Sequence, residues 1–170
     1  MEAIRRYEFF TNLCSRKSAP VNYFQSFTFN IIMATSSINA IFKGGMNFTA
    51  DINGHKVEID TDESRGGKNL GTRPKALMLA SLAGCTGLDV VGILNKMRVN
   101  FSDLSIKVDA HLTDEEAAIY DEVVVNYTIK VEKADEPKVE KAVKLSQEKY
   151  CGVTKMFQAF SKVSYKIFYI

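Results

Sequence analysis

The chain has 170 residues, of which 46% are hydrophobic and 25% are charged, proportions typical of a soluble globular protein. Its 22 basic and 20 acidic residues leave a formal net charge of +2, with no basic stripe, so nothing predicts a nucleic-acid partner. No apolar run looks long enough to cross a bilayer, and we expect neither a membrane-embedded nor a membrane-bound protein.

The first 33 residues lack the regular patterning of the rest of the chain. Their short apolar stretch, residues 24–33, is a weak secretory signal without a small-residue cleavage site. An alternative is that Met33 is the true start, and we favour it because regular patterning begins directly after Met33. We therefore expect residues 1–33 to be a disordered or mis-assigned extension, and residues 34–170 to form a single domain.

Three short strands are expected at the start of this domain. Apolar and polar residues alternate over residues 37–43, with one residue out of phase, and again over 56–60; a further strand is expected at 48–52. The dipeptide Asn53-Gly54 separates the second strand from the third, and both residues tolerate the positive φ of a type I′ hairpin turn. Residues 61–72 are polar and form a loop.

A long apolar helix follows the loop. Pro74 suits its first turn, and apolar residues recur at helical spacing up to residue 96. Gly84 and Gly87 flank Cys85, and each glycine costs a helix interior about 1 kcal/mol relative to alanine. If Gly84 breaks the helix, Cys85 lies in a new first turn, where the helix dipole favours a thiolate; if the helix is continuous, the dipole assists little.

The second half of the domain repeats these patterns. Residues 104–112 and 123–131 alternate as two long half-buried strands around an acidic turn. Pro137 opens a second helix, Cys151-Gly152 breaks it, and residues 163–169 form a last strand. The resulting order, β-β-β-α-β-β-α-β, predicts an α+β fold.

Cysteine chemistry is the main functional signal. Three widely spaced cysteines are a poor disulfide framework, so we expect reduced thiols in the cytoplasm. There is no CxxC, and His55 and His111 lie far apart, so local motifs predict no metal site and no cofactor. Cys14 falls in the N-terminal extension and is given no role. From spacing alone, Cys85 and Cys151 are more often buried small hydrophobes than reactive thiols, and Asp89, one turn beyond Cys85, opposes thiolate formation.

Two motifs resemble the OsmC/Ohr family. The first is an apolar helix after a proline, with Gly84-Cys85-Thr86 followed by Asp89-Val90-Val91 and Ile93-Leu94-Asn95-Lys96. The second is Leu145-Ser-Gln-Glu-Lys-Tyr-Cys151. Both occur in the family's order, and the likeness in element order covers roughly residues 36–170.

The resemblance implies an intertwined homodimer, with long central helices wrapped by antiparallel sheet and sites at the interface. It also implies thiol-dependent reduction of organic hydroperoxides. Cys85 would be the peroxidatic thiol, and Cys151 would resolve its sulfenic acid as a disulfide. A dithiol or a thioredoxin-like protein would be the reductant.

The family's usual charged partners are replaced here. A glutamate normally follows the proline, where this chain has Lys75 and Ala76, and no arginine lies between Met33 and Ser64. Arg73 and Arg65 are the nearest substitutes and are expected to assist Cys85 electrostatically. The alternative is a non-catalytic dimer that binds a small lipophilic molecule in its interface pocket. A weaker one is a purely structural homodimer.

Overall fold

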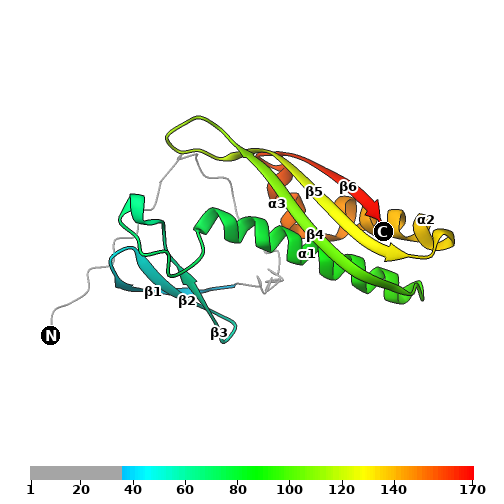
Figure 1. Ribbon diagram of the computed structural model, residues 1–170, viewed down its shortest axis with the longest axis horizontal. Coiled ribbons are helices and arrows are strands. Elements are labelled where there is room, and N and C mark those ends of the chain that lie inside the picture. Colours follow the sequence, from blue (N-terminus) through cyan, green and yellow to red (C-terminus); the bar gives the residue numbers. More distant parts are fainter. Residues whose placement is uncertain (1–35) are drawn as a thin grey trace, which may run out of the picture. The chain divides into compact units, whose positions relative to one another are not determined.

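The computed structural model describes residues 36–170 (Figure 1), so the predictions about residues 1–33 and Cys14 lie outside the described residues. Residues Ser37–Ile170 belong to one unit with two three-stranded sheets, ordered β1-β2-β3 and β4-β5-β6. The α+β expectation is confirmed. The elements are β1 (Asn39–Gly44), β2 (Asn47–Ile52), β3 (His55–Ile59), η1 (Glu63–Arg65), α1 (Pro74–Lys96), β4 (Phe101–Leu112), β5 (Tyr120–Val131), η2 (Lys133–Asp135), α2 (Glu136–Leu145), η3 (Ser146–Tyr150), α3 (Gly152–Gln158) and β6 (Lys162–Tyr169).

The first sheet is an antiparallel meander with little core of its own. Asn53 and Gly54 have φ values of 54° and 82°, as the predicted type I′ turn requires, and β2 pairs with β3 on either side of them. Ala50 is the one residue of β1–β3 that is buried. A sheet of this size needs an apolar face packed against something to be stable.

The loop before α1 is held by one buried carboxylate. Asp60 is 3% exposed and accepts hydrogen bonds from the backbone N–H groups of Thr61, Lys68 and Leu70 at 2.8, 3.1 and 3.0 Å. These bonds, chiefly the one from Leu70, hold the pKa of Asp60 below its ordinary value. The predicted polar loop is therefore an ordered turn, although most of its residues are exposed to solvent.

Helix α1 is continuous from Pro74 to Lys96, which decides between the two alternatives for Gly84. Cys85 lies in the middle of the helix. A Cβ on Gly87 would lie 2.9 Å from Cδ1 of Ile106 on β4, whereas a Cβ on Gly84 would meet nothing within 4 Å. A side chain at Gly87 would thus displace the end of the Ile106 side chain where α1 packs on β4.

The apolar character of α1 exceeds the sequence-based expectation. By length and composition α1 could cross a membrane, and 22% of its most apolar window is buried. The expectation that no apolar segment is long enough to cross a bilayer is therefore wrong. The small residues and isolated polar residues of α1 leave its mean hydropathy high enough to meet this criterion. The core helix of a soluble protein meets the same criterion, so this finding alone does not place α1 in a membrane.

The second sheet carries the core. β4 and β5 pair antiparallel, and β5 and β6 pair parallel. The antiparallel sheet that was expected thus includes one parallel pair, β5 with β6, because helices α2 and α3 return the chain to the same end before β6 begins. All three α-helices lie on one face of this sheet (Figure 1). The inward-facing side chains of β5 are fully buried beneath them: Val123, Val125, Tyr127 and Ile129.

Candidate functional site

The two cysteines named by the sequence share one site. Cys85 lies on α1, and Cys151 lies where the second helical segment breaks between the π-helical turn η3 and α3. Cys151 has an extended backbone, φ −72° and ψ 101°, and its Sγ accepts a hydrogen bond from the N–H of Thr154 at 3.3 Å. The predicted break at Cys151-Gly152 is confirmed.

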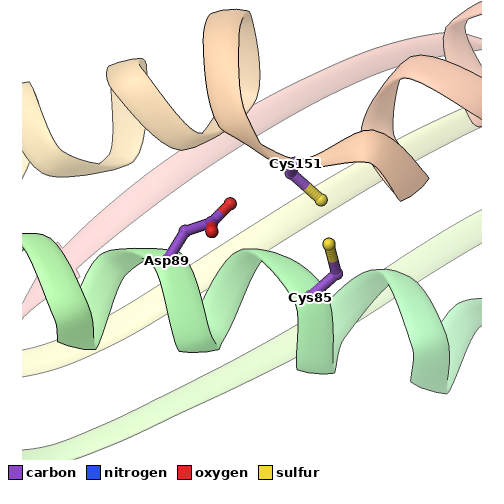
Figure 2. A group of neighbouring side chains, drawn as sticks. All are labelled: Cys85, Asp89 and Cys151. Carbon is purple, nitrogen blue, oxygen red and sulfur yellow. The ribbon is translucent and has the colours of Figure 1, made fainter.

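A carboxylate completes the group. The Sγ atoms of Cys85 and Cys151 and a carboxylate oxygen of Asp89 all lie within 4.8 Å of one another. Figure 2 shows the two sulfur atoms facing each other, with Asp89 one helical turn along α1 on the same side. Both cysteines are free thiols. The arrangement brings two oxidisable sulfur atoms and a carboxylate into one small volume.

The two thiols differ in accessibility and environment. Cys151 is 2% exposed, whereas Cys85 is half-buried. Burial raises the pKa of the Cys85 thiol above its ordinary value of 9.0, and its hydrogen bond with Cys151 and the charge of Asp89 act in the same direction. The backbone N–H of Val153 opposes this rise. The mid-helix position gives Cys85 little help from the helix dipole.

A chain of buried hydrogen bonds lies beside the cysteines. Ser146 Oγ donates to Asp89 Oδ2 at 2.9 Å, and Ser146 Oγ and Thr86 Oγ1 are 2.8 Å apart. Thr86 Oγ1 also contacts the hydroxyl of Tyr127. Gln147 Nε2 donates to Tyr127 Oη at 2.7 Å. These hydrogen bonds link α1, β5 and η3 through side chains that are buried, apart from the partly buried Asp89 at the end.

Only one assignment of donors and acceptors is consistent along this series of hydrogen bonds. The hydroxyl of Ser146 has one proton, which goes to the carboxylate of Asp89, so Thr86 must donate to Ser146. Tyr127 must then donate to Thr86, and it accepts from Gln147. All donors therefore point toward Asp89, which fixes the orientation of that carboxylate next to the two sulfur atoms.

The sequence analysis did not predict this hydrogen-bond network, although the polar residues that form it stand out in the sequence. Thr86, Tyr127 and Ser146 each occupy an inward position of an otherwise apolar periodic pattern, and each is buried. Polar groups in such positions normally find hydrogen-bond partners. Three of them on three elements predict a shared network once the elements are known to pack together.

The two arginines that were predicted to assist Cys85 lie away from it in the structure. Arg65 and Arg73 line a cavity of about 600 Å³ near the start of α1, and Arg73 pairs with Asp62 at 3.3 Å. From residue 73 to residue 85 the helix rises roughly 18 Å at 1.5 Å per residue. Within one chain, the structure does not bring either arginine to Cys85.

A second cavity borders the site. It has a volume of about 570 Å³ and lies between α1 and η3, with Asp89 in its wall. Its apolar lining includes Leu88, Ile93, Leu145 and Tyr150. Neither cysteine lines this cavity, and Asp89 is the residue that it shares with the cysteine group.

Comparison with known proteins agrees with this architecture. Protein YhfA of Escherichia coli K12 is 26% identical over 115 residues, covering 67% of this chain and 83% of YhfA. The crystal structure of a hypothetical protein from Aquifex aeolicus VF5 has a TM-score of 0.67 at 27% identity and covers 81% of this chain and 99% of that one. An organic hydroperoxide resistance protein OsmC from Legionella pneumophila has a TM-score of 0.58 at 18% identity, covering 80% and 98%.

The family match rests on the segment that contains both cysteines. Residues 66–166 match the family model described as OsmC-like protein. This segment spans α1 to β6 and makes up more than half of the 170 residues. The chain therefore belongs to the OsmC-like protein family.

Proposed function

We propose that the protein is a thiol-dependent reductase of organic hydroperoxides, with Cys85 and Cys151 as its redox couple. The observation that carries the proposal is that the two thiols and Asp89 have ligand atoms within 4.8 Å of one another in a single chain. The half-buried Cys85 is reachable by a substrate, and the buried Cys151 is suited to a second step. The organic hydroperoxide resistance protein from Legionella, a structural neighbour, supports this class of substrate.

The reaction has three balanced steps. The Cys85 thiolate attacks the distal peroxide oxygen, the O–O bond breaks, and the products are Cys85 sulfenic acid and an alkoxide that takes a proton to become an alcohol. The Cys151 sulfur then attacks the sulfenic sulfur, giving a disulfide and water. A dithiol, or a thioredoxin-like protein, reduces the disulfide by thiol exchange and is itself oxidised.

The cavity beside Asp89 fits the organic part of such a substrate. Its apolar lining, including Leu88, Ile93 and Leu145, offers contacts for a hydrocarbon group. The reacting peroxide would point toward Cys85. We therefore propose that hydroperoxides with a bulky apolar group are preferred to hydrogen peroxide.

We also propose that the protein works as a homodimer in the cytoplasm. Leu88 and Met78 on α1 are 77% and 43% exposed in one chain, and Phe42 and Phe48 on the first sheet are 58% and 40% exposed. Exposed apolar surface of this kind normally marks an interface. Reduced thiols are what cytoplasmic conditions maintain. In a dimer, the arginines of one protomer could also lie near the cysteines of the other.

Peroxide turnover tests the proposal. With dithiothreitol as reductant, the protein should consume cumene hydroperoxide, and Cys85→Ser should abolish turnover. Cys14→Ser should leave turnover unchanged and serves as the matched control. Absence of turnover by the fully reduced parent protein would remove the proposed activity.

The oligomeric state has its own test. Leu88→Glu places a charge on the exposed face of α1 and should convert the dimer to monomers in size-exclusion chromatography with light scattering. Lys130→Glu changes the charge at an exposed position of β5 and should leave the dimer intact. A monomeric parent protein would contradict the dimer proposal.

The raised pKa of Cys85 favours a second candidate function. A thiol that stays protonated at neutral pH reacts slowly with peroxides, and among the described residues 36–170 neither Arg65 nor Arg73 lies beside Cys85. In that case the protein would bind a small lipophilic molecule in the cavity next to Asp89 without turnover. Binding of a fluorescent fatty acid that persists when both cysteines are serine, in a protein without peroxidase activity, would favour this second function.

A further inference from the structure

The group Cys85, Asp89 and Cys151 has a feature that peroxide reduction does not use. Two sulfur atoms and a carboxylate oxygen converge within 4.8 Å. Among the described residues 36–170, this is the one such convergence of three metal-ligating side chains. Thiolates with a carboxylate form a donor set that suits zinc, whereas magnesium and calcium prefer oxygen donors alone.

We propose that Cys85, Asp89 and Cys151 bind a zinc ion when both thiols are reduced. The inference does not rest on peroxidase activity, because it concerns only the three donor groups. Local sequence motifs gave no metal site, since the third ligand comes from a different helix. The fold, rather than a CxxC or a histidine pair, creates the cluster.

The backbone places the donors suitably for a tetrahedral ion. Cys85 and Asp89 are one turn apart on the same face of α1, and Cys151 faces them from the break before α3 (Figure 2). Zinc–sulfur bonds of about 2.3 Å in tetrahedral geometry separate two thiolate ligands by about 3.8 Å. This separation lies within the 4.8 Å limit that the three ligand atoms satisfy. Three protein ligands leave a fourth position for water or a small molecule.

Two hydrogen bonds hold the donors in position. Ser146 Oγ donates to Asp89 Oδ2 at 2.9 Å, at the end of the chain that begins at Gln147 and runs through Tyr127 and Thr86. The N–H of Thr154 donates to Cys151 Sγ at 3.3 Å. Outer contacts of this kind orient metal ligands and raise affinity. Ser146 is therefore a positioning residue for the proposed ion.

Metal binding and disulfide formation exclude each other, because both use the same two sulfur atoms. The reduced protein should bind zinc, and the protein oxidised with diamide should not. Bound zinc should likewise protect both thiols from alkylation. The oxidised form is thus a control with an unchanged sequence.

Cobalt substitution tests the site with a spectroscopic signal. The reduced full-length protein, titrated with Co²⁺, should bind a single ion per chain with a sulfur-to-cobalt charge-transfer band and the visible bands of a tetrahedral complex. Zinc should displace the cobalt. Cys85→Ser and Cys151→Ser should each weaken that band, and the double variant should abolish it, while Cys14→Ser should leave it intact.

The oxygen side of the site needs separate variants. Asp89→Asn should weaken zinc binding in a chelator competition by at least about tenfold, and Ser146→Ala by roughly ten- to a hundredfold, as loss of an outer contact does. Far-UV circular dichroism and thermal unfolding would identify any variant that fails to fold. Zinc binding unchanged in the Cys85→Ser, Cys151→Ser double variant, or absent from the reduced parent, would overturn the proposal.

Zinc binding and hydroperoxide turnover can fail independently of each other. A protein that shows the cobalt–thiolate band but no hydroperoxide turnover keeps the metal site and loses the peroxidase. A protein that turns over hydroperoxide but binds neither cobalt nor zinc does the reverse.

Discussion

The Sγ atoms of Cys85 and Cys151 lie within 4.8 Å of each other, although the residues belong to different helical segments. A disulfide bond is about 2.05 Å long, so rotation of the two side chains has to close most of the remaining gap. The extended backbone at Cys151 points its side chain at α1 (Figure 2). The pair is therefore close enough for the reversible disulfide bond that we propose.

We predict that one equivalent of cumene hydroperoxide converts this pair to an intramolecular disulfide. The parent protein should lose two free thiols and about 2 Da, and dithiothreitol should restore both. Cys151→Ser should stop at a sulfenic acid on Cys85, which dimedone traps for mass spectrometry. Dimedone labelling of Cys151 in Cys85→Ser, at a rate equal to that of Cys85 in Cys151→Ser, would reverse the assigned roles.

The reactivity of Cys85 should rise with pH beyond the range of a free thiol. Burial is the main cause that raises its pKa above 9.0, followed by the hydrogen bond with Cys151. Alkylation by iodoacetamide should therefore reach half its maximal rate above pH 9.0, and Cys151→Ala should lower that midpoint. A midpoint near neutrality would show that a cation, such as an arginine of a second chain, stabilises the thiolate.

The raised pKa of the Cys85 thiol also makes the stability of the protein depend on pH. Because the folded protein holds the Cys85 proton more tightly than the unfolded chain, the free energy of unfolding is fully maintained below pH 9.0. It should fall as pH rises through the higher pKa of the folded state, since the unfolded thiol ionises first. Urea unfolding of the parent and of Cys85→Ala would measure this effect: the difference in free energy of unfolding between the two proteins should be constant below pH 9.0 and should change with pH above it.

Much of the fold could be predicted because its signals are local. Alternation marked the long strands, and Asn53-Gly54 marked a hairpin that the φ values of 54° and 82° confirm. Two cysteine motifs indicated which helices carry the site. The parallel pairing of β5 with β6 could not be derived, because it depends on where the second helical segment returns the chain.

The environment of the cysteines was less predictable than their identity. Whether Gly84 interrupts α1 depended on packing, since an open space around Gly84 imposes no break. Asp89 was expected from its spacing to oppose the Cys85 thiolate; burial is the larger cause that raises the pKa of Cys85, and the charge of Asp89 acts in the same direction. The separation of Arg73 from Cys85 follows from their spacing along one continuous helix, whereas the position of Arg65 depends on the path of the preceding loop, which no sequence pattern fixes.

Asp60 should be essential for the loop that leads into α1. Asp60→Asn replaces one carboxylate oxygen by an NH₂ group that faces backbone N–H donors, so the urea midpoint should fall at neutral pH. Because the pKa of Asp60 is lowered from 3.8, its stabilisation is present above that pH and is lost as pH falls through the folded-state pKa. The two proteins should therefore converge in acid.

The control for this prediction is Asp114→Asn, an equal change of charge at an exposed position of the β4–β5 turn, which should have little effect. Hydrogen exchange gives a local readout, because the amides of Lys68 and Leu70 donate to Asp60. Unchanged protection of both amides in Asp60→Asn would contradict the proposed role.

Because all donors in the buried hydrogen-bond network point toward Asp89, replacing its residues should lower the free energy of unfolding by unequal amounts. Tyr127→Phe removes one donor to Thr86, and Gln147 keeps a weaker bond to Thr86 at 3.3 Å, so we expect a loss of about 1 kcal/mol. Thr86→Val removes the middle of the chain, leaves the hydroxyl of Tyr127 without an acceptor and deprives Ser146 of its donor. We expect it to cost about 2–3 kcal/mol.

Tyr165→Phe is the matched control for this comparison. Tyr165 lies on β6, packs edge-on against Tyr127 at 6.5 Å between ring centroids, and is 39% exposed, so its loss of a hydroxyl should change stability by less than about 0.5 kcal/mol. Urea unfolding of the three variants and of the Thr86→Val, Tyr127→Phe pair measures the coupling. If the protons ran in the opposite direction, Ser146 would have no proton left for Asp89, and Thr86→Val would leave the affinity for cobalt unchanged. Because the donors point toward Asp89, we expect Thr86→Val to weaken cobalt binding as well as stability.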